Sequence, residues 1–309
     1  FASALVAPLR ARYPGVELGV WCKAYAADVA ALIPTVGEVI AADPFWDRAP
    51  GHGKGRLVPF LQSVKRVRRA RYDVAILAAA PWRTAAAVAL AGIPARIGLE
   101  RHRNPRFLTH VMAPEDKQRP VLVEMARLLG PLGISATGLR YTLDRAPIAA
   151  RIARMQAQLA RPSAALHPFA SKRARCVPVP EWITMARALD ERGFEPIWIG
   201  TDAELQEVRT ASGDRAWRTV RDLGDGSLAD TAALLAASAV FAGHDSGPLH
   251  VAGAFGVPVL GVFAPGEPKR TFPQGTGPSR MIARPSPAGI TAQEMLAELL
   301  ALTAAGRAG

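Results

Sequence analysis

The chain has 309 residues, half of them hydrophobic, and a formal net charge of +12. This length suits two domains of roughly 150 residues, each with its own core. No apolar run approaches the roughly 20 residues that cross a bilayer. The two cysteines, Cys22 and Cys176, lack the spacing of a disulfide framework or a zinc site. Composition therefore argues against an integral membrane protein and a disulfide-stapled one, and we expect a cytoplasmic protein.

The positive charge is concentrated in the first half of the chain. Residues 1–144 hold 20 Lys and Arg against 11 Asp and Glu, whereas residues 145–309 hold 18 against 15. A basic protein raises the question of nucleic acid. We find no zinc-finger spacing and only 6% aromatic residues for stacking on bases, so we expect no nucleic-acid partner. An anionic substrate at a membrane surface explains the one-sided charge equally well.

Apolar periodicity and breaker residues predict alternating helices and strands before residue 144. The predicted elements are helices at 3–12, 24–33, 57–72, 84–91 and 120–132, and strands at 16–21, 38–42, 73–79 and 95–99. An α/β domain normally begins with a strand and a loop, so we expect that this first strand and its loop are missing here. The Gly-rich loop at 49–56 resembles a phosphate cradle only superficially, because no Ser or Thr follows Lys54.

Two basic features of the first half are candidates for contact with an anionic partner. The predicted helix at 57–72 is amphipathic and basic, and a solvated face is the simpler interpretation, with membrane-surface contact the second. Its cations are Lys65, Arg66, Arg68, Arg69 and Arg71. Arg101 and Arg103 follow the predicted strand at 95–99, and we expect them to bind the acidic or phosphate groups of an acceptor.

The second half repeats the order strand, loop, helix. A connection at 145–162 contains a predicted helix at 148–159. The predicted elements that follow are strands at 164–166, 196–199, 239–242 and 259–263, and helices at 181–193, 249–255 and 290–305. The last helix is a candidate to cross back to the first domain. In a doubly wound sheet, the loops after these strands open onto one crevice.

Polar residues are concentrated at 245–250, between two apolar runs. Gly247 lets the backbone approach an anion closely, Ser246 adds a hydroxyl, and Pro248 suits the first turn of a helix. The free N–H groups of that helix favour a phosphate. A simpler alternative is that Asp245 or Ser246 caps a buried helix and that His250 is a core histidine.

The run from Asp245 to Pro268 resembles the donor-site signature of the bacterial heptosyltransferase family, glycosyltransferase family 9. Residues 167–175 are similar to a second family motif, with Phe169 in place of its usual Gly and Arg175 in place of Lys. Ala264 and Gly266 depart from the usual Gly and Thr. The change to arginine keeps the charge but alters the geometry.

The resemblance implies an α/β fold of the GT-B type, with two Rossmann-like doubly wound domains that face a central cleft. The domains would be an acceptor-binding domain at 1–144, a linker at 145–162 and a donor-binding domain at 163–309. It implies these donor-binding residues: Ser171, Lys172, Arg175, Gly200, Thr201, Glu204, Asp245, Ser246, Gly247 and His250. The catalytic base of the family lies in the loop that we expect to be missing upstream of Phe1.

The implied activity is inverting transfer of heptose from ADP-heptose onto an anionic lipopolysaccharide core acceptor. Cationic side chains and N–H groups would stabilise the leaving diphosphate, and no Asp-x-Asp pair is present to hold a metal, so we expect neither a metal nor another cofactor. A glycolipid acceptor also implies peripheral contact with the inner membrane. The alternative is a non-catalytic nucleotide- or glycan-binding protein on the same scaffold.

Overall fold

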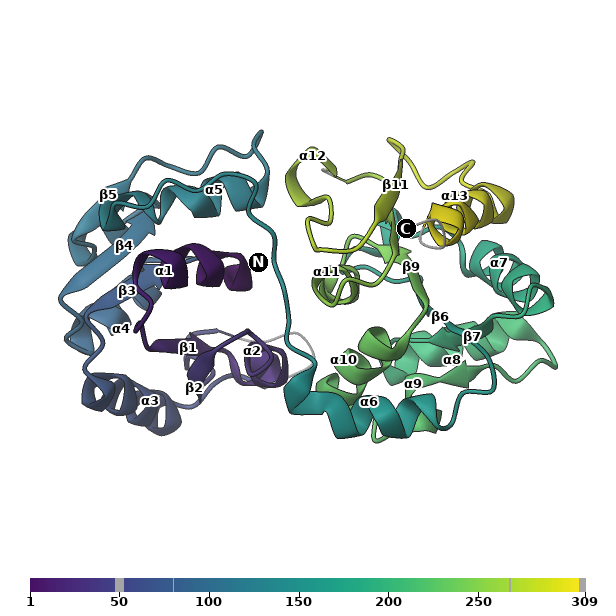
Figure 1. Cartoon of the computed structure of the whole chain (residues 1–309), viewed down its shortest axis with the longest axis horizontal. Coiled ribbons are helices and arrows are strands. Elements are labelled where there is room, and N and C mark those ends of the chain that lie inside the picture. The colour runs from purple at the N-terminus through teal and green to yellow at the C-terminus, as the bar shows by residue number, and fades with distance from the viewer. Residues whose placement is uncertain (48–52, 80, 267, 306–309) are drawn as a thin grey trace. The chain divides into compact units, whose positions relative to one another are not determined.

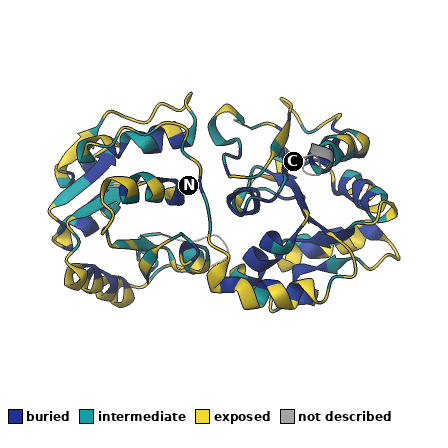
Figure 2. Cartoon of the chain, viewed as in Figure 1, coloured by how far each residue is buried: buried dark blue, intermediate teal, exposed yellow. Residues whose placement is uncertain are grey.

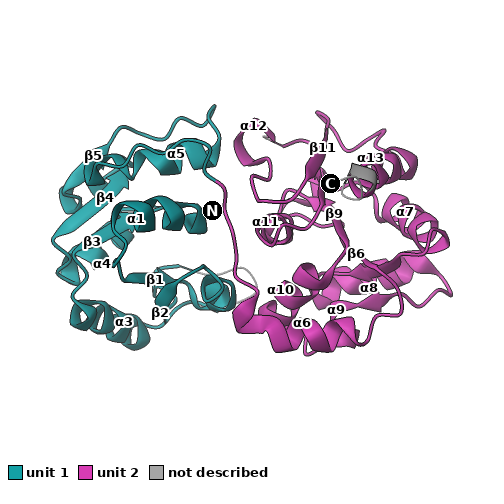
Figure 3. Cartoon of the chain, viewed as in Figure 1, with its two compact units in different colours: residues 1–139 teal, residues 140–309 magenta. Residues whose placement is uncertain are grey.

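The computed structural model describes residues 1–47, 53–79, 81–266 and 268–305 (Figure 1). Residues 49–52 of the predicted Gly-rich loop lie outside this set. The chain divides into two compact units, residues 1–139 and 140–309 (Figure 3). Both are α/β, as the sequence predicts.

The first unit contains short parallel strands flanked by helices. Its elements are η1 (Ala2–Leu5), α1 (Val6–Arg12), β1 (Leu18–Cys22), η2 (Ala24–Ala26), α2 (Ala27–Ala30), β2 (Val36–Ala41), α3 (Leu57–Ala70), β3 (Val74–Leu77), α4 (Trp82–Leu90), β4 (Ala95–Leu99), η3 (Asn104–Phe107), β5 (His110–Met112), α5 (Val121–Arg127) and η4 (Gly130–Leu132). The described strands form two sheets, β1-β2 and β3-β4-β5. Their order leaves β1 and β3 with one paired edge each. A strand upstream of α1 stays a prediction.

Helix α3 shows how the sequence builds this unit. Phe60, Val64 and Val67 recur at helical spacing and are buried in a core that includes Ile40 and Leu77. The helix ends at Ala70, two residues before the predicted end, because Arg71 takes a left-handed conformation (φ 53°) and its N–H bonds to the Arg68 carbonyl.

The second unit contains a longer series of the same elements. They are η5 (Ala146–Ile148), α6 (Ala149–Gln156), β6 (Ser163–His167), η6 (Arg173–Arg175), α7 (Val179–Glu191), β7 (Glu195–Trp198), α8 (Asp202–Ser212), β8 (Arg218–Thr219), α9 (Val220–Leu223), α10 (Leu228–Ala237), β9 (Val240–His244), α11 (Gly247–Ala254), β10 (Val259–Phe263), α12 (Pro268–Thr271), β11 (Ser279–Ala283) and α13 (Ala292–Ala305). Helix α8 begins at Asp202, among the predicted donor-binding residues Gly200, Thr201 and Glu204. The strands pair in the order β11-β10-β9-β6-β7-β8, and all the pairs are parallel.

This six-stranded sheet is the centre of the second unit. Every residue of β6, β9 and β10 is buried, so these strands have helices on both faces (Figure 2). Met295, Leu299 and Leu302 of α13 lie in the same core as Trp182 of α7, which makes the last helix part of this unit. The chain order reverses between β6 and β9, which is the switch point where doubly wound sheets bind ligands.

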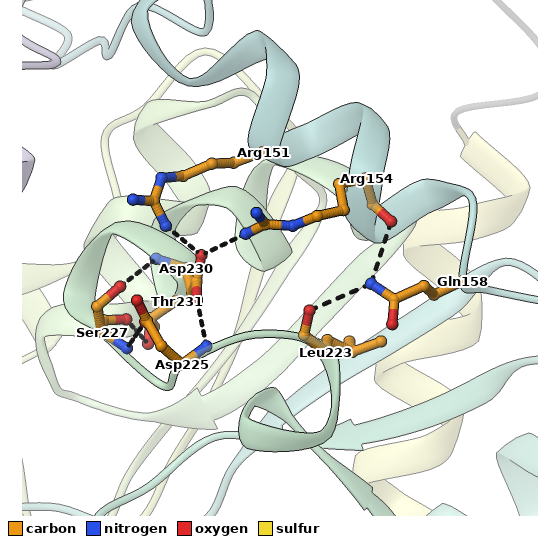
Figure 4. Close-up of polar contacts among 8 residues, drawn as sticks. All are labelled: Arg151, Arg154, Gln158, Leu223, Asp225, Ser227, Asp230 and Thr231. Atoms are coloured by element: carbon orange, nitrogen blue, oxygen red, sulfur yellow. Dashed lines mark hydrogen bonds and ion pairs between the residues drawn. The ribbon is translucent and has the colours of Figure 1, made fainter.

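The boundary between the units falls five residues before the predicted end of the first domain, and the predicted linker lies within the second unit. The reason is that α6 packs on α10 through a buried carboxylate, as Figure 4 shows. Asp230 is fully buried, and its Oδ1 accepts hydrogen bonds from Arg151 (2.6 Å) and Arg154 (3.2 Å). Its Oδ2 accepts the N–H of Asp225 (2.7 Å). Three donors therefore satisfy a carboxylate that would otherwise be costly to bury.

Candidate functional site

The candidate site lies where the carboxyl ends of β6 and β9 meet. These strands are hydrogen-bonded neighbours, so the loop after His167 and the loop after His244 begin side by side. A small hollow, open to solvent, lies there. Ser171, Arg175 and Asp245 line it, together with residues 262–265 at the end of β10. Three of the predicted donor-binding residues are thus brought together from two segments 70 residues apart in sequence.

Helix α11 begins beside this hollow, as the sequence predicts. Ser246 is its N-cap by position, but its side chain makes no capping hydrogen bond to the first turn. Pro248 stands in that turn, and nothing lies within 4 Å of where a Cβ on Gly247 would be. The helix ends at Ala254, and Gly256, two residues further on, has a left-handed φ of 77°. The start of α11 therefore offers backbone N–H groups to an anion without side-chain competition.

The Ser246 hydroxyl is engaged on the protein side. It lies 3.1 Å from His167 Nδ1 and 3.1 Å from the His244 carbonyl oxygen, to which it donates. A hydroxyl carries one proton, so while it donates to the carbonyl, its oxygen accepts from His167. Ser246 thus ties β9 to β6, and a contact with a ligand phosphate would require this hydroxyl to exchange partners.

Two buried histidines, neither of them predicted as a site residue, fasten the loops of the site. His244 Nε2 accepts the Val177 N–H at 3.0 Å, and its Nδ1 lies 3.2 Å from the Val262 carbonyl oxygen. This pattern requires a neutral ring with the proton on Nδ1. Burial, and to a lesser degree the nearby His167, lowers the pKa of His244 to about 4. Burial also lowers the pKa of His167 to about 4, so both rings are neutral near pH 7.

Asp245 and His250 form the other side of the site. Asp245 Oδ2 accepts the Thr271 hydroxyl at 3.0 Å, and its Oδ1 lies 3.4 Å from His250 Nε2. His250 Nδ1 lies 3.1 Å from the hydroxyl of Tyr141, a residue that sequence analysis did not single out. The side chains of Asp245 and His250 remain 26% and 16% exposed, so a ligand can reach them.

The loop after β6 supplies the cations. Ser171 and Lys172 are exposed, and Arg175 is half-buried at the hollow. Arg173 points elsewhere, since it is paired with Glu207. Phe169, which replaces the usual Gly of the family motif, is fully buried in the core. The structure therefore separates Arg175, which lines the hollow, from Arg173, which stabilises the surface of α8.

Gly200, Thr201 and Glu204 form the start of α8 and do not line the hollow. Thr201 and Glu204 make a capping box: the Thr201 hydroxyl accepts the Glu204 N–H, and Glu204 Oε2 accepts the Thr201 N–H at 2.8 Å. The pattern Thr-x-x-Glu was visible in the sequence as a helix start. Their assignment to the donor remains a prediction, and their observed role is structural.

In the first unit, Arg101 and Arg103 are exposed in the loop after β4, and they make no ion pair with any carboxylate among the described residues. Fully buried Asn104 organises this loop. Its Oδ1 accepts the Arg101 N–H at 2.8 Å, and its Nδ2 donates to the Leu99 carbonyl at 2.9 Å.

The part of the chain that the structure describes contains no group of three or more His, Cys, Asp or Glu side chains placed to hold a metal ion. Among the described helices, none combines the length and apolar composition needed to cross a membrane.

Comparison with known proteins places this chain in a family. Residues 60–286 match the model for glycosyltransferase family 9 (heptosyltransferase). Lipopolysaccharide heptosyltransferase 2 of Escherichia coli strain K12 is 23% identical over 291 residues, which cover 88% of this chain and 81% of that protein.

Solved structures agree with the family match. E. coli ADP-heptose lps heptosyltransferase II has a TM-score of 0.77 at 21% identity, over 99% of this chain and 95% of that one. The E. coli heptosyltransferase WaaC with ADP has a TM-score of 0.77 at 17% identity, over 97% of this chain and 94% of that one. At these identities the likeness establishes the fold: two Rossmann-like domains of the GT-B type, as predicted.

Proposed function

Because this chain belongs to glycosyltransferase family 9, the heptosyltransferase family, we propose that it transfers heptose from ADP-heptose to a lipopolysaccharide core or related anionic glycan. The observation that carries the proposal is the hollow at the switch point of the second unit. Arg175, Ser171 and Asp245 line it beside the uncapped start of α11. A diphosphate needs this combination of N–H donors and fixed positive charge.

In the proposed reaction, the acceptor hydroxyl attacks the anomeric carbon of heptose while ADP departs from the opposite face. Charge develops on the departing diphosphate, so donors fixed in advance lower the barrier. The N–H groups at the start of α11, with Lys172 and Arg175, take this role and make a metal unnecessary. Asp245 accepts hydrogen bonds from donor hydroxyls, because each of its oxygens keeps acceptor capacity beyond its one described contact. A general base must take the proton of the acceptor hydroxyl as the new bond forms.

The experiment that tests donor binding is calorimetric titration with ADP. Arg175→Ala removes one charge-assisted contact worth about 1.5 to 3 kcal/mol and should weaken ADP binding by roughly ten- to a hundredfold. Arg173→Ala is the matched control: it removes the same charge two residues away, from a side chain paired with Glu207. Its affinity for ADP should change by less than about threefold. Equal losses in both variants would mean that only the general positive field matters and would remove Arg175 from the site.

We also propose that the first unit holds the enzyme at the cytoplasmic face of the inner membrane. Helix α3 exposes Leu57, Val58 and Leu61 near its start, with exposed fractions of 50%, 64% and 40%. The same exposed side of α3 continues toward the end of the helix with three cations at helical spacing, Lys65, Arg68 and Arg69. Apolar side chains beside cations suit the surface of an anionic bilayer.

Sedimentation with vesicles tests this membrane contact. Replacing Lys65, Arg68 and Arg69 by Gln should release the protein from vesicles rich in anionic phospholipid, since each cation contributes about 1 kcal/mol near such a surface. Neutral vesicles and the variant Arg12→Gln, an exposed cation stacked on Tyr13 in the same unit, serve as controls. Unchanged sedimentation of the triple variant would contradict the assignment.

A further inference from the structure

Hydrogen bonds hold the segment 140–145 at both ends, to residues 274–275 at its start and to the end of helix α11 at its finish. The Leu143 N–H donates to the Ala254 carbonyl at 3.0 Å, and Arg145 donates to the Phe255 carbonyl at 2.7 Å. At its start, Arg140 donates to the Gly275 carbonyl at 2.7 Å. Segment 140–145 therefore has a fixed position beside the helix that carries His250.

Tyr141 is the residue of segment 140–145 that reaches toward the candidate site. Its side chain is 1% exposed, and its ring meets the His250 ring edge-to-face with centroids 5.9 Å apart. Its backbone N–H donates to the Gln274 carbonyl (3.3 Å), and its hydroxyl oxygen accepts the Gln274 N–H (3.0 Å). The same hydroxyl lies 3.1 Å from His250 Nδ1. The Tyr141 hydroxyl thus stands between a backbone donor and an imidazole nitrogen.

The surroundings of His250 decide which nitrogen carries the proton. Nε2 faces Asp245 Oδ1 at 3.4 Å, and a bare nitrogen lone pair would repel that carboxylate. Neutral imidazole has one N–H, so a proton on Nε2 leaves Nδ1 as an acceptor. The hydroxyl of Tyr141 then donates to Nδ1 while its oxygen accepts the Gln274 N–H. Burial raises the pKa of Tyr141, so the hydroxyl keeps the proton that this arrangement needs.

We propose that Tyr141 is a positioning residue of the donor site: its hydroxyl holds His250 in the tautomer that turns an N–H toward Asp245. The Thr271 hydroxyl holds the second oxygen of the same carboxylate, at 3.0 Å. Together these contacts fix the plane of the Asp245 carboxylate at the hollow. The inference rests on the proposed function, because it assigns Tyr141 a role in binding the nucleotide-sugar donor.

Ring-nitrogen NMR on histidine-labelled protein tests the proton placement without a ligand. The signal of His250 is assigned by its loss in His250→Gln. The wild type should show a bare Nδ1 and a protonated Nε2, and Tyr141→Phe should shift His250 toward a mixture of both tautomers. Tyr72→Phe is the matched control, since it removes a hydroxyl bonded to Glu38 at 3.1 Å in the other unit. It should leave the His250 signal unchanged.

A double-mutant cycle with ADP tests the consequence for the site. Tyr141→Phe should weaken ADP binding by roughly two- to tenfold, the range of one hydrogen bond. The same substitution in the His250→Gln background should have no further effect, because its partner is gone. A general loss of packing, or of the acceptor for the Gln274 N–H, would weaken binding equally in both backgrounds.

The outcomes separate the two proposals. An unchanged His250 tautomer in Tyr141→Phe, or additive losses in the cycle, would overturn the role of Tyr141 while leaving donor binding intact. A wild-type protein that does not bind ADP would overturn the proposed function, and the donor-site role of Tyr141 with it, whatever tautomer His250 adopts.

Discussion

The described strands of the second unit form one continuous sheet, whereas those of the first unit form two separate sheets. In the second unit, β6 lies between β7 on one side and β9 on the other. In the first unit, β1 and β2 correspond to β7 and β8, and β3, β4 and β5 correspond to β9, β10 and β11. No described strand there corresponds to β6. The difference shows in burial: all residues of β6 and β9 are buried, whereas β1 has no fully buried residue and β3 has one, Leu77.

This comparison explains where the candidate site is most complete. A central strand contributes the loop at its carboxyl end to the switch point, and in the second unit the loop after β6 supplies Ser171 and Arg175. Two buried histidines then fix the neighbouring loops. His244 accepts a hydrogen bond from the Val177 N–H, and His167 is hydrogen-bonded to the Ser246 hydroxyl. The first unit offers exposed cations instead. We therefore expect the site in the second unit to depend on neutral buried histidines, and anion binding by the first unit to depend on long-range charge.

The largest expected effect is the loss of stability of the second unit in mild acid. His167 and His244 have pKa values of about 4 when folded, against about 6.5 when unfolded. The unfolded chain therefore binds more protons as the pH falls below 6.5, so stability is full above that pH and is lost toward pH 4. Each histidine should lower the free energy of unfolding by about 2 kcal/mol at pH 5 relative to pH 7.5, and the pair by about 4 kcal/mol. Urea unfolding at a series of pH values, monitored by hydrogen exchange of the β9 and β10 amides, measures this loss of unfolding free energy.

The variant His244→Gln sharpens this test. Glutamine stays neutral, so the loss of unfolding free energy between pH 7.5 and pH 5 that the two histidines cause should fall by about half. His102→Gln, at an exposed position of the first unit, should leave the pH dependence as it is in the wild type. If His244→Gln and wild type lose stability in parallel, the buried histidines do not set the acid limit.

A smaller loss is expected when α6 is released from α10. Asp230→Ala removes a fully buried carboxylate that accepts from Arg151, Arg154 and the Asp225 N–H. The expected loss of unfolding free energy is about 2 to 4 kcal/mol. Asp190→Ala is the control, because Asp190 also binds two arginines, Arg161 and Arg215, but near the surface. It should cost under about 1 kcal/mol. If both variants lose a similar amount of unfolding free energy, burial does not explain the contribution of Asp230 to stability.

The sequence predicted the features that depend on neighbouring residues. The order of β9, loop, α11 and β10 follows from apolar runs within 25 residues, and the end of α11 just before Gly256 follows from glycine chemistry. Contacts between distant segments could not be predicted this way. Tyr141 lies 109 residues from His250, and no local pattern marks either residue as the partner of the other.

Two further differences have local physical causes. Strand β5 has only three residues, His110–Met112, and all are exposed or half-buried, so it lacks the apolar run that marks a strand. At Gly200 the sequence suggested a ligand loop, but the capping box of Thr201 and Glu204 begins α8. A polar residue after a strand can bind the free N–H groups at the start of the next helix or can bind a ligand. The sequence pattern is the same for both roles, and only the fold distinguishes them.

The smallest expected effect concerns the first unit, where the charge is exposed. Arg101 and Arg103 stand in a loop ordered by Asn104, and each exposed cation contributes about 1 kcal/mol toward an anionic surface within a Debye length of about 8 Å. Raising the salt concentration should therefore increase KM for the acceptor more than KM for the donor, whose site is partly buried. Arg101→Ala with Arg103→Ala should flatten the salt dependence for the acceptor, and Arg12→Ala should not. If KM rises in parallel with salt for both substrates and the double substitution does not change this, these arginines are only surface charges. The assignment of acceptor binding to the first unit would then be wrong.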